Sequence, residues 1–379
     1  MLSFIVLLCV LEVAIRLLAN FPPRLIQRSA DIGGHYRPGL ETRLIAPESG
    51  KSILVSINQL GFRGPQFPIN KSANTMRVAI LGDSQTAAIN MNQTDTLRDV
   101  LSTQLAENFT DVEWQVMDFS VSGASTAQQL NLFRQRVKQY DVDLVICAFY
   151  NGNDFSDNSR QLSSNPRIYM HLADGGELVT QYVEPSTGWI QWLKQNSRFY
   201  QWQKLKVRAV RRNAISRGWL GEKSRVRGGL LGFADKDEIR LNDAWRLNDA
   251  LLTAFNREVL GNGAEFLLLS IPHSLEFDSQ QEASIRNRFS STPYAGSFTP
   301  KNVENHLQEI SNRERFPAIF VNDEFRKLLK QGRAESKDYH LAYLDGAGHV
   351  NEIGQKVMAN RIVQKISIDP NTVSLELKY

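Results

Sequence analysis

The chain has 379 residues, 42% hydrophobic and 22% charged, a composition that excludes a disordered protein and allows a full hydrophobic core. Its formal net charge of +4 is too small for this length to indicate nucleic-acid binding. The two cysteines, Cys9 and Cys147, lie in separate apolar runs, which argues against a disulfide framework. Because it has no Cys-x-x-Cys or His-x-x-x-His pair, the sequence predicts no metal site and no cofactor.

The N-terminal stretch Met1–Leu18 is apolar apart from the charged residues Glu12 and Arg16. As a helix it would be about 27 Å long, close to the roughly 30 Å hydrocarbon core of a bilayer. Glu12 and Arg16 are four positions apart, so on a helix they share a face and can pair. The positive start and small-x-small cleavage site of a signal peptide are missing. We therefore expect a transmembrane anchor at residues 1–19, with a buried core helix as the alternative.

Residues 20–75 are expected to form a linker and a small β lead-in. A Pro-Pro pair fits the linker, and two short strands are predicted at Leu40–Ile45 and Ser52–Ile57. The glycine-punctuated loop Asn58–Pro65 follows and contains Arg63. We expect Arg63 to clamp loop carbonyls rather than to bind a ligand.

Strands and helices alternate in the main domain, which is expected at residues 76–370. The run Val78–Leu81 is long enough for a buried strand and too short for a helix. Further strands are predicted at Trp114–Phe119, Leu144–Tyr150, Phe266–Ile271 and Ala318–Val321, and helices at Thr96–Asn108, through Leu130 and Tyr140, at Ala244–Leu260 and after Val350. This order with short connections predicts a parallel, doubly wound α/β sheet.

A basic helical insertion interrupts this pattern near residues 188–230. Within it, residues 192–227 carry eleven Lys and Arg side chains against the single acid Glu222, with aromatic residues interleaved. One interpretation is an amphipathic helix with a solvated basic face. The other is a surface that meets anionic lipid headgroups or an acidic polymer.

Three predicted strands end in polar, glycine-bearing loops, which contain Ser84, Gly123 and Asn153. The carboxyl ends of parallel strands lie at one edge of a sheet, so these loops should converge on one crevice. A serine hydroxyl there can attack an acyl carbon if a base removes its proton. The backbone N–H groups of Ser84 and Gly123 and the Asn153 side-chain amide can bind the resulting oxyanion.

Histidine is the expected base, and six are present. His349 is the leading candidate because it directly precedes the final helix and follows Asp345, whose carboxylate could orient the imidazole. His273, which follows the fourth strand, is the runner-up.

These blocks resemble the SGNH, or GDSL-type, hydrolases. The family is named for the serine, glycine, asparagine and histidine that here are Ser84, Gly123, Asn153 and His349, and the block Val116–Thr126 is similar over its whole length. One departure is that the family usually places its aspartate three positions before the histidine, whereas Asp345 lies four before His349.

The resemblance implies a three-layer α/β/α, flavodoxin-like fold and a metal-free serine esterase with a Ser84–His349–Asp345 site, acting on ester-linked acyl groups, acetyl above all. The Asn-x-x-Gly-Phe-Arg-Gly loop at residues 58–64 is similar to that of membrane-tethered bacterial members. A catalytic domain in the periplasm or outside the cell is therefore expected, although the side of the membrane stays open.

Two alternatives share these residues. One is an O-acyltransferase that passes the acyl group to a polysaccharide, and the other is a binding module that retains the fold without activity. In each case the expected partners are an acylated small molecule or polysaccharide and a membrane, not a nucleic acid.

Overall fold

The computed structural model describes residues 2–18, 25–45, 50, 52–184, 188–216, 228–290, 292–334, 348–369 and 374–378. It divides into two compact units. The smaller contains Met1–Leu25 and Glu184–Arg225, and the larger contains Ile26–Val183 and Val226–Tyr379.

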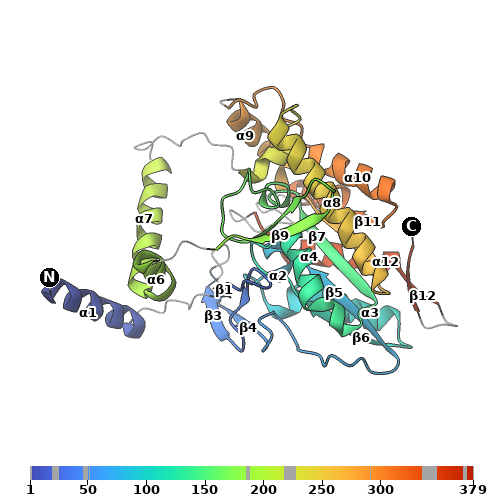
Figure 1. Ribbon diagram of the computed structural model, residues 1–379, viewed down its shortest axis with the longest axis horizontal. Coiled ribbons are helices and arrows are strands. Elements are labelled where there is room, and N and C mark those ends of the chain that lie inside the picture. The colour runs from blue at the N-terminus through green and yellow to red at the C-terminus, as the bar shows by residue number, and fades with distance from the viewer. Residues whose placement is uncertain are drawn as a thin grey trace. The chain divides into compact units, whose positions relative to one another are not determined.

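A five-stranded sheet forms the centre of the larger unit (Figure 1). Its strands are β5 (Thr75–Leu81), β6 (Glu113–Asp118), β7 (Leu144–Tyr150), β10 (Glu265–Ile271) and β11 (Ala318–Phe320). They run parallel in the order β11-β10-β7-β5-β6. In chain order this is the 2-1-3-4-5 arrangement of flavodoxin-like sheets, whose ligand crevice lies beyond the carboxyl ends of the first and third strands. The predicted parallel α/β sheet is confirmed.

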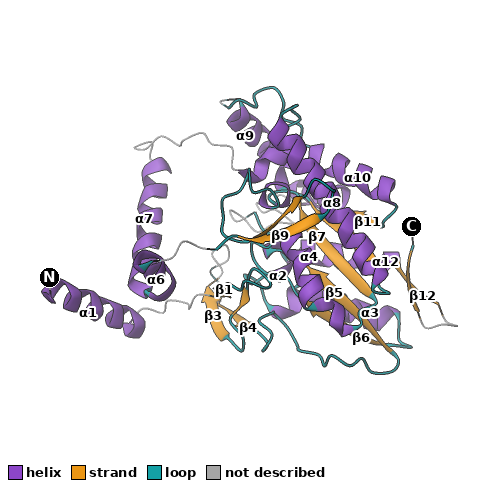
Figure 2. Ribbon diagram, viewed as in Figure 1, coloured by secondary structure: helices purple, strands orange, loops and turns teal. Residues whose placement is uncertain are grey.

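Helices cover both faces of this sheet (Figure 2). Alternate residues of β7 enter different cores: Val145, Cys147 and Phe149 pack on one face, and Leu144 and Ile146 on the other. The first core is completed by α4 (Thr126–Gln135), α8 (Ile239–Gly261), α9 (Ser279–Phe289) and α10 (Asn302–Glu314). The second is completed by α3 (Leu97–Asn108), α11 (Asn322–Ala334) and α12 (Glu352–Lys365). Burial on both faces explains why β7 is uniformly apolar in sequence.

Short antiparallel hairpins surround the sheet. They are β1 (Ile26–Gln27) with β2 (His35–Tyr36), β3 (Glu41–Ile45) with β4 (Ser52–Ser56), β8 (Ile168–Leu172) with β9 (Leu178–Tyr182), and β12 (Ile366–Asp369) with β13 (Ser374–Leu377). The β3–β4 pair confirms the two predicted lead-in strands, whereas the β8–β9 hairpin was not predicted.

Arg63 is a structural clamp, as predicted. Its buried guanidinium donates to the backbone oxygens of Ala87, Ala88 and Met91, and its Nε donates to Gln93 Oε1 at 2.9 Å. These bonds tie the lead-in loop to the segment that follows β5.

The smaller unit contains α1 (Leu2–Leu18), α6 (Trp189–Asn196) and α7 (Arg198–Ser216). Among the described residues, no helix combines the length and apolarity needed to cross a membrane. The transmembrane anchor expected at residues 1–19 is therefore not supported. Glu12 and Arg16 pair at 2.7 Å, as expected. Glu12 also accepts hydrogen bonds from the backbone N–H groups of Arg198 and Phe199 at the start of α7.

Candidate active site

Ser84 begins the short helix α2 (Ser84–Ala87) directly beyond the carboxyl end of β5. Gly82 makes this sharp turn possible, because a Cβ there would lie 2.3 Å from Thr86 Oγ1 and 2.9 Å from the Ala148 side chain. Asp83 caps the helix by accepting a hydrogen bond from the Gln85 N–H at 2.8 Å. The half-buried Ser84 is thereby held at the edge of the sheet, next to β7.

The loop after β6 brings Gly123 to the same edge. Two bonds fix this loop against the serine turn, from Thr86 Oγ1 to Ser120 Oγ at 2.8 Å and from the Val121 N–H to the Gly82 oxygen at 3.1 Å. Gly123 has a φ of +80°, and among the described residues a Cβ there would meet no atom within 4 Å.

Tyr36 holds the residue before Gly123. The buried Tyr36 hydroxyl accepts a hydrogen bond from the Ser122 N–H at 3.0 Å and contacts Ser122 Oγ at 2.8 Å. The β lead-in therefore helps to shape the site.

Asn153 lies beyond the carboxyl end of β7, at the start of α5 (Asp154–Asp157). Its Nδ2 donates to Asp83 Oδ2 at 3.2 Å and to Asp157 Oδ2 at 3.4 Å, while its buried Oδ1 has no partner among the described residues. Asp157 also pairs with Arg167 at 3.1 Å. Burial raises the pKa of Asp83 to about 6. The Asn153 amide is thus tied between two carboxyl groups, and Asp83 staples two loops together.

His349 lies against the serine, with its Nε2 3.0 Å from Ser84 Oγ. The Gln85 side chain brackets the histidine: its Nε2 donates to the Gly348 oxygen at 3.0 Å, and its Oε1 accepts from the Val350 N–H at 2.9 Å. The sequence did not identify this role for Gln85, although its position directly after the serine was a signal. Asp345 lies outside the described residues.

The backbone N–H groups of Ser84 and Gly123 remain available. Neither donates a hydrogen bond to any residue that the structure describes. Together with the Ser84–His349 contact, this arrangement offers a nucleophile, a base and two donors at one edge of the sheet.

His273, the runner-up base, has a different role. Its Nδ1 accepts from the Leu275 N–H at 3.2 Å, so the neutral imidazole carries its proton on Nε2. Burial lowers the pKa of His273 to about 4. This histidine caps the short 3-10 helix Ser274–Glu276 after β10.

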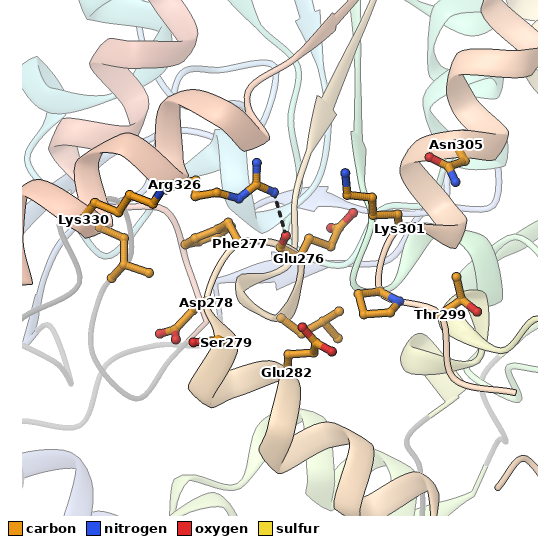
Figure 3. A pocket seen from close by; sticks show the side chains of 13 residues that line it. Glu276, Phe277, Asp278, Ser279, Glu282, Thr299, Lys301, Asn305, Arg326 and Lys330 are labelled. Atoms are coloured by element: carbon orange, nitrogen blue, oxygen red, sulfur yellow. Dashed lines mark hydrogen bonds between the residues drawn. The ribbon is translucent and has the colours of Figure 1, made fainter. Parts of the chain in front are cut away.

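A cavity of about 670 Å³ lies beside this 3-10 helix. Figure 3 shows Glu276 at its wall, with Arg326 donating to the Glu276 backbone oxygen at 3.2 Å, and Lys301 and Lys330 among the lining residues. The Glu276 carboxyl accepts from Asn151 Nδ2 at 3.0 and 3.1 Å, and burial raises its pKa to about 8. The cavity wall is thus linked to the loop that carries Asn153.

Metal ligands are not gathered anywhere in the described ranges, where no group of three or more His, Cys, Asp or Glu side chains could hold an ion.

No protein-family model matches the sequence, and no curated protein matches it. Among solved structures, the chain is similar to the acetyl xylan esterase AlAXEase, with 12% identity, a TM-score of 0.40, and coverage of 76% of this chain and 98% of that one. It is also similar to TesA (11% identity, TM-score 0.39, 76% and 97% coverage). A third is the lipase/acylhydrolase from Enterococcus faecalis (12% identity, TM-score 0.41, 80% and 99% coverage).

Proposed function

We propose that this protein is a serine ester hydrolase of the SGNH type, with Ser84 as nucleophile and His349 as general base. One observation carries the proposal: Ser84 Oγ lies 3.0 Å from His349 Nε2, within hydrogen-bonding reach. The pair sits beyond β5, beside β7, where a sheet of this order has its ligand crevice.

The reaction proceeds through an acyl-enzyme. His349 Nε2 takes the Ser84 hydroxyl proton as Oγ attacks the acyl carbon, and the carbonyl electron pair moves onto the oxygen. The tetrahedral intermediate then collapses and expels the alcohol, whose oxygen receives the proton from His349. Water then attacks the acyl-enzyme while His349 takes one of its protons. The second intermediate collapses, the bond from the acyl carbon to Ser84 Oγ breaks, and His349 returns the proton to Oγ as the acid leaves.

The oxyanion would be bound by the N–H groups of Ser84 and Gly123. The Asn153 amide is proposed as a third donor, for which one of its hydrogens must leave the Asp83 or Asp157 carboxyl group. Asp345 is proposed to orient the His349 imidazole. Each well-placed oxyanion donor contributes on the order of 10²–10³ in kcat.

An active-serine phosphonate probe and a small acetyl ester test the proposal together. Ser84→Ala should abolish labelling and lower kcat/KM by on the order of 10⁴-fold or more, and His349→Ala should have a comparable effect. Ser122→Ala is the matched control. The Ser122 hydroxyl contacts Tyr36, so this variant should still be labelled at Ser84. Labelling and hydrolysis that survive in Ser84→Ala would refute the assignment.

Product analysis in the presence of an added glycan then separates hydrolysis from transfer. Free acid as the only product supports a hydrolase, whereas an acylated glycan would reassign the reaction to transfer.

A further inference from the structure

Within the smaller unit, Glu12 of α1 joins this helix to the start of α7. Its Oε2 accepts from Ser197 Oγ at 2.8 Å and from the Phe199 N–H at 3.0 Å, and its Oε1 accepts from the Arg198 N–H at 3.0 Å. Although burial opposes ionisation, these hydrogen bonds lower the pKa of Glu12 to about 2. A charged carboxylate from α1 thus caps the N-terminus of α7, which favours negative charge. These hydrogen bonds fix which face of α1 is turned toward α7.

Another face of α1 is apolar and uncovered. Val6, Val10, Val13 and Leu17 follow one another at helical spacing and therefore lie on one side of the helix. Each of these four side chains is more than half exposed. A helix that is apolar on this side normally turns it into a protein core or a lipid phase. Within the smaller unit, none of the described residues covers this stripe.

The other two helices add aromatic and cationic side chains. On α6, Trp189 and Trp192 are 73% and 62% exposed and three positions apart, so they share a side. The sequence of α7 contains six Lys or Arg residues and no Asp or Glu. Among these, Lys204 and Lys206 are exposed, and Lys206 Nζ lies 5.7 Å from the centre of the Trp202 ring.

We infer that α1, α6 and α7 form a lipid-docking unit that lies in the headgroup region of an anionic bilayer. Exposed tryptophan is the side chain enriched at membrane–water interfaces, and an apolar stripe beside Lys and Arg is the pattern of interfacial helices. Cations near an anionic leaflet are attracted to it. A second copy of the chain is disfavoured as the occupant, because a two-fold contact would bring two cationic α7 helices together.

This inference does not depend on the activity proposed for the larger unit, so either can fail alone. The full-length chain is sedimented with vesicles of phosphatidylcholine alone or of phosphatidylcholine mixed with phosphatidylglycerol. We expect binding about tenfold tighter or more to the mixed vesicles, weakening as salt is raised.

Cys9 provides a direct report on α1. It is exposed, whereas Cys147 is buried, so a polarity-sensitive fluorophore can be attached to α1 without any mutation. Its emission should shift to shorter wavelength with anionic vesicles and stay unchanged with neutral ones.

Matched variants separate binding through this surface from non-specific adsorption to vesicles. Lys204→Glu with Lys206→Glu should weaken binding to mixed vesicles by about tenfold or more, because each cation near the surface adds to the attraction. Lys138→Glu with Lys327→Glu makes the same charge change on exposed residues of the larger unit and should leave binding unchanged. Trp189→Gln with Trp192→Gln should also weaken binding, whereas Ile239→Gln, at a side chain 74% exposed on α8, should not.

Equal binding to neutral and anionic vesicles would overturn the inference, as would control variants that lose binding to the same extent. A dimer that forms without vesicles and shifts the Cys9 fluorophore would also overturn it, by assigning the uncovered stripe to a second copy.

Discussion

Replacing Gln85 tests whether its side chain positions His349. The amide makes two hydrogen bonds, one to each neighbour of the histidine, and is itself 2% exposed. Gln85→Met keeps the length of the side chain and removes both bonds. The Gly348 oxygen also accepts from the Tyr150 hydroxyl at 3.3 Å and so keeps a partner, but the Val350 N–H belongs to a residue that is 1% exposed. Leaving that donor unsatisfied costs about 1–3 kcal/mol.

The loop can recover this free energy by moving, and that movement would displace His349 from the serine. A misplacement of about 1 Å in a reacting geometry costs roughly 10²-fold in rate. We therefore expect Gln85→Met to lower kcat about 10- to 100-fold while KM changes little, measured on a soluble acetyl ester alongside thermal unfolding.

Gln129→Met is the matched control. Gln129 is also buried, and its Nε2 donates to the Ala148 oxygen at 3.0 Å, away from the histidine loop. It should lose comparable stability and keep its kcat. If Gln85→Met loses stability but retains kcat within twofold, the positioning argument is refuted.

Three further outcomes are expected. Asn153→Ala should lower kcat on the acetyl ester by about 10²-fold, and a loss below threefold would remove Asn153 from the oxyanion site. Tyr36→Phe should cost about 1–2 kcal/mol of unfolding free energy and several-fold in kcat, because the Ser122 N–H loses its acceptor; unchanged kinetics would confine Tyr36 to stability. The Glu276 carboxyl has its pKa raised from 4.5 to about 8, so it keeps its proton in the folded chain after the unfolded chain has lost it. The free energy of unfolding contributed in this way is fully present below pH 4.5 and is lost as the pH rises toward 8. In denaturant titrations across this range, Glu276→Gln should show a smaller loss of unfolding free energy than the unmodified chain. An equal loss in both would contradict the assignment.

The strand ends could be predicted because they depend on local sequence and on one topological rule. Ser84, Gly123 and Asn153 each follow an apolar run, and parallel strands gather their carboxyl ends at one edge. His349 could be predicted from the loop before the last helix.

The contacts that hold these residues could not be predicted, because they join segments that are distant in sequence. Tyr36 is 86 positions from Ser122, and Gln85 is 263 positions from Gly348. The pairing of Glu12 could not be predicted for a similar reason. Hydropathy alone does not reveal that Glu12 accepts a hydrogen bond from the Phe199 N–H at the start of α7, 187 positions away.

Buried carboxyl groups staple the loops at four of the five strand ends. Asp83, Asp118, Asp154 and Glu276 are each nearly inaccessible, and burial raises the pKa of each. Each accepts a backbone N–H from within four positions, from Gln85, Ser120, Tyr150 and His273 respectively. These bonds hold the turns that shape the crevice. Above the ordinary carboxyl pKa, however, the unfolded chain gains free energy by ionising these groups while the folded chain keeps them neutral, and this lowers the free energy of unfolding. Between the ordinary carboxyl pKa and neutrality, the folded chain holds more protons than the unfolded chain, so these groups lower stability as pH rises. The loops around Ser84 are thus held in place at a cost in stability that is largest at neutral and higher pH, where a histidine base is unprotonated and able to act.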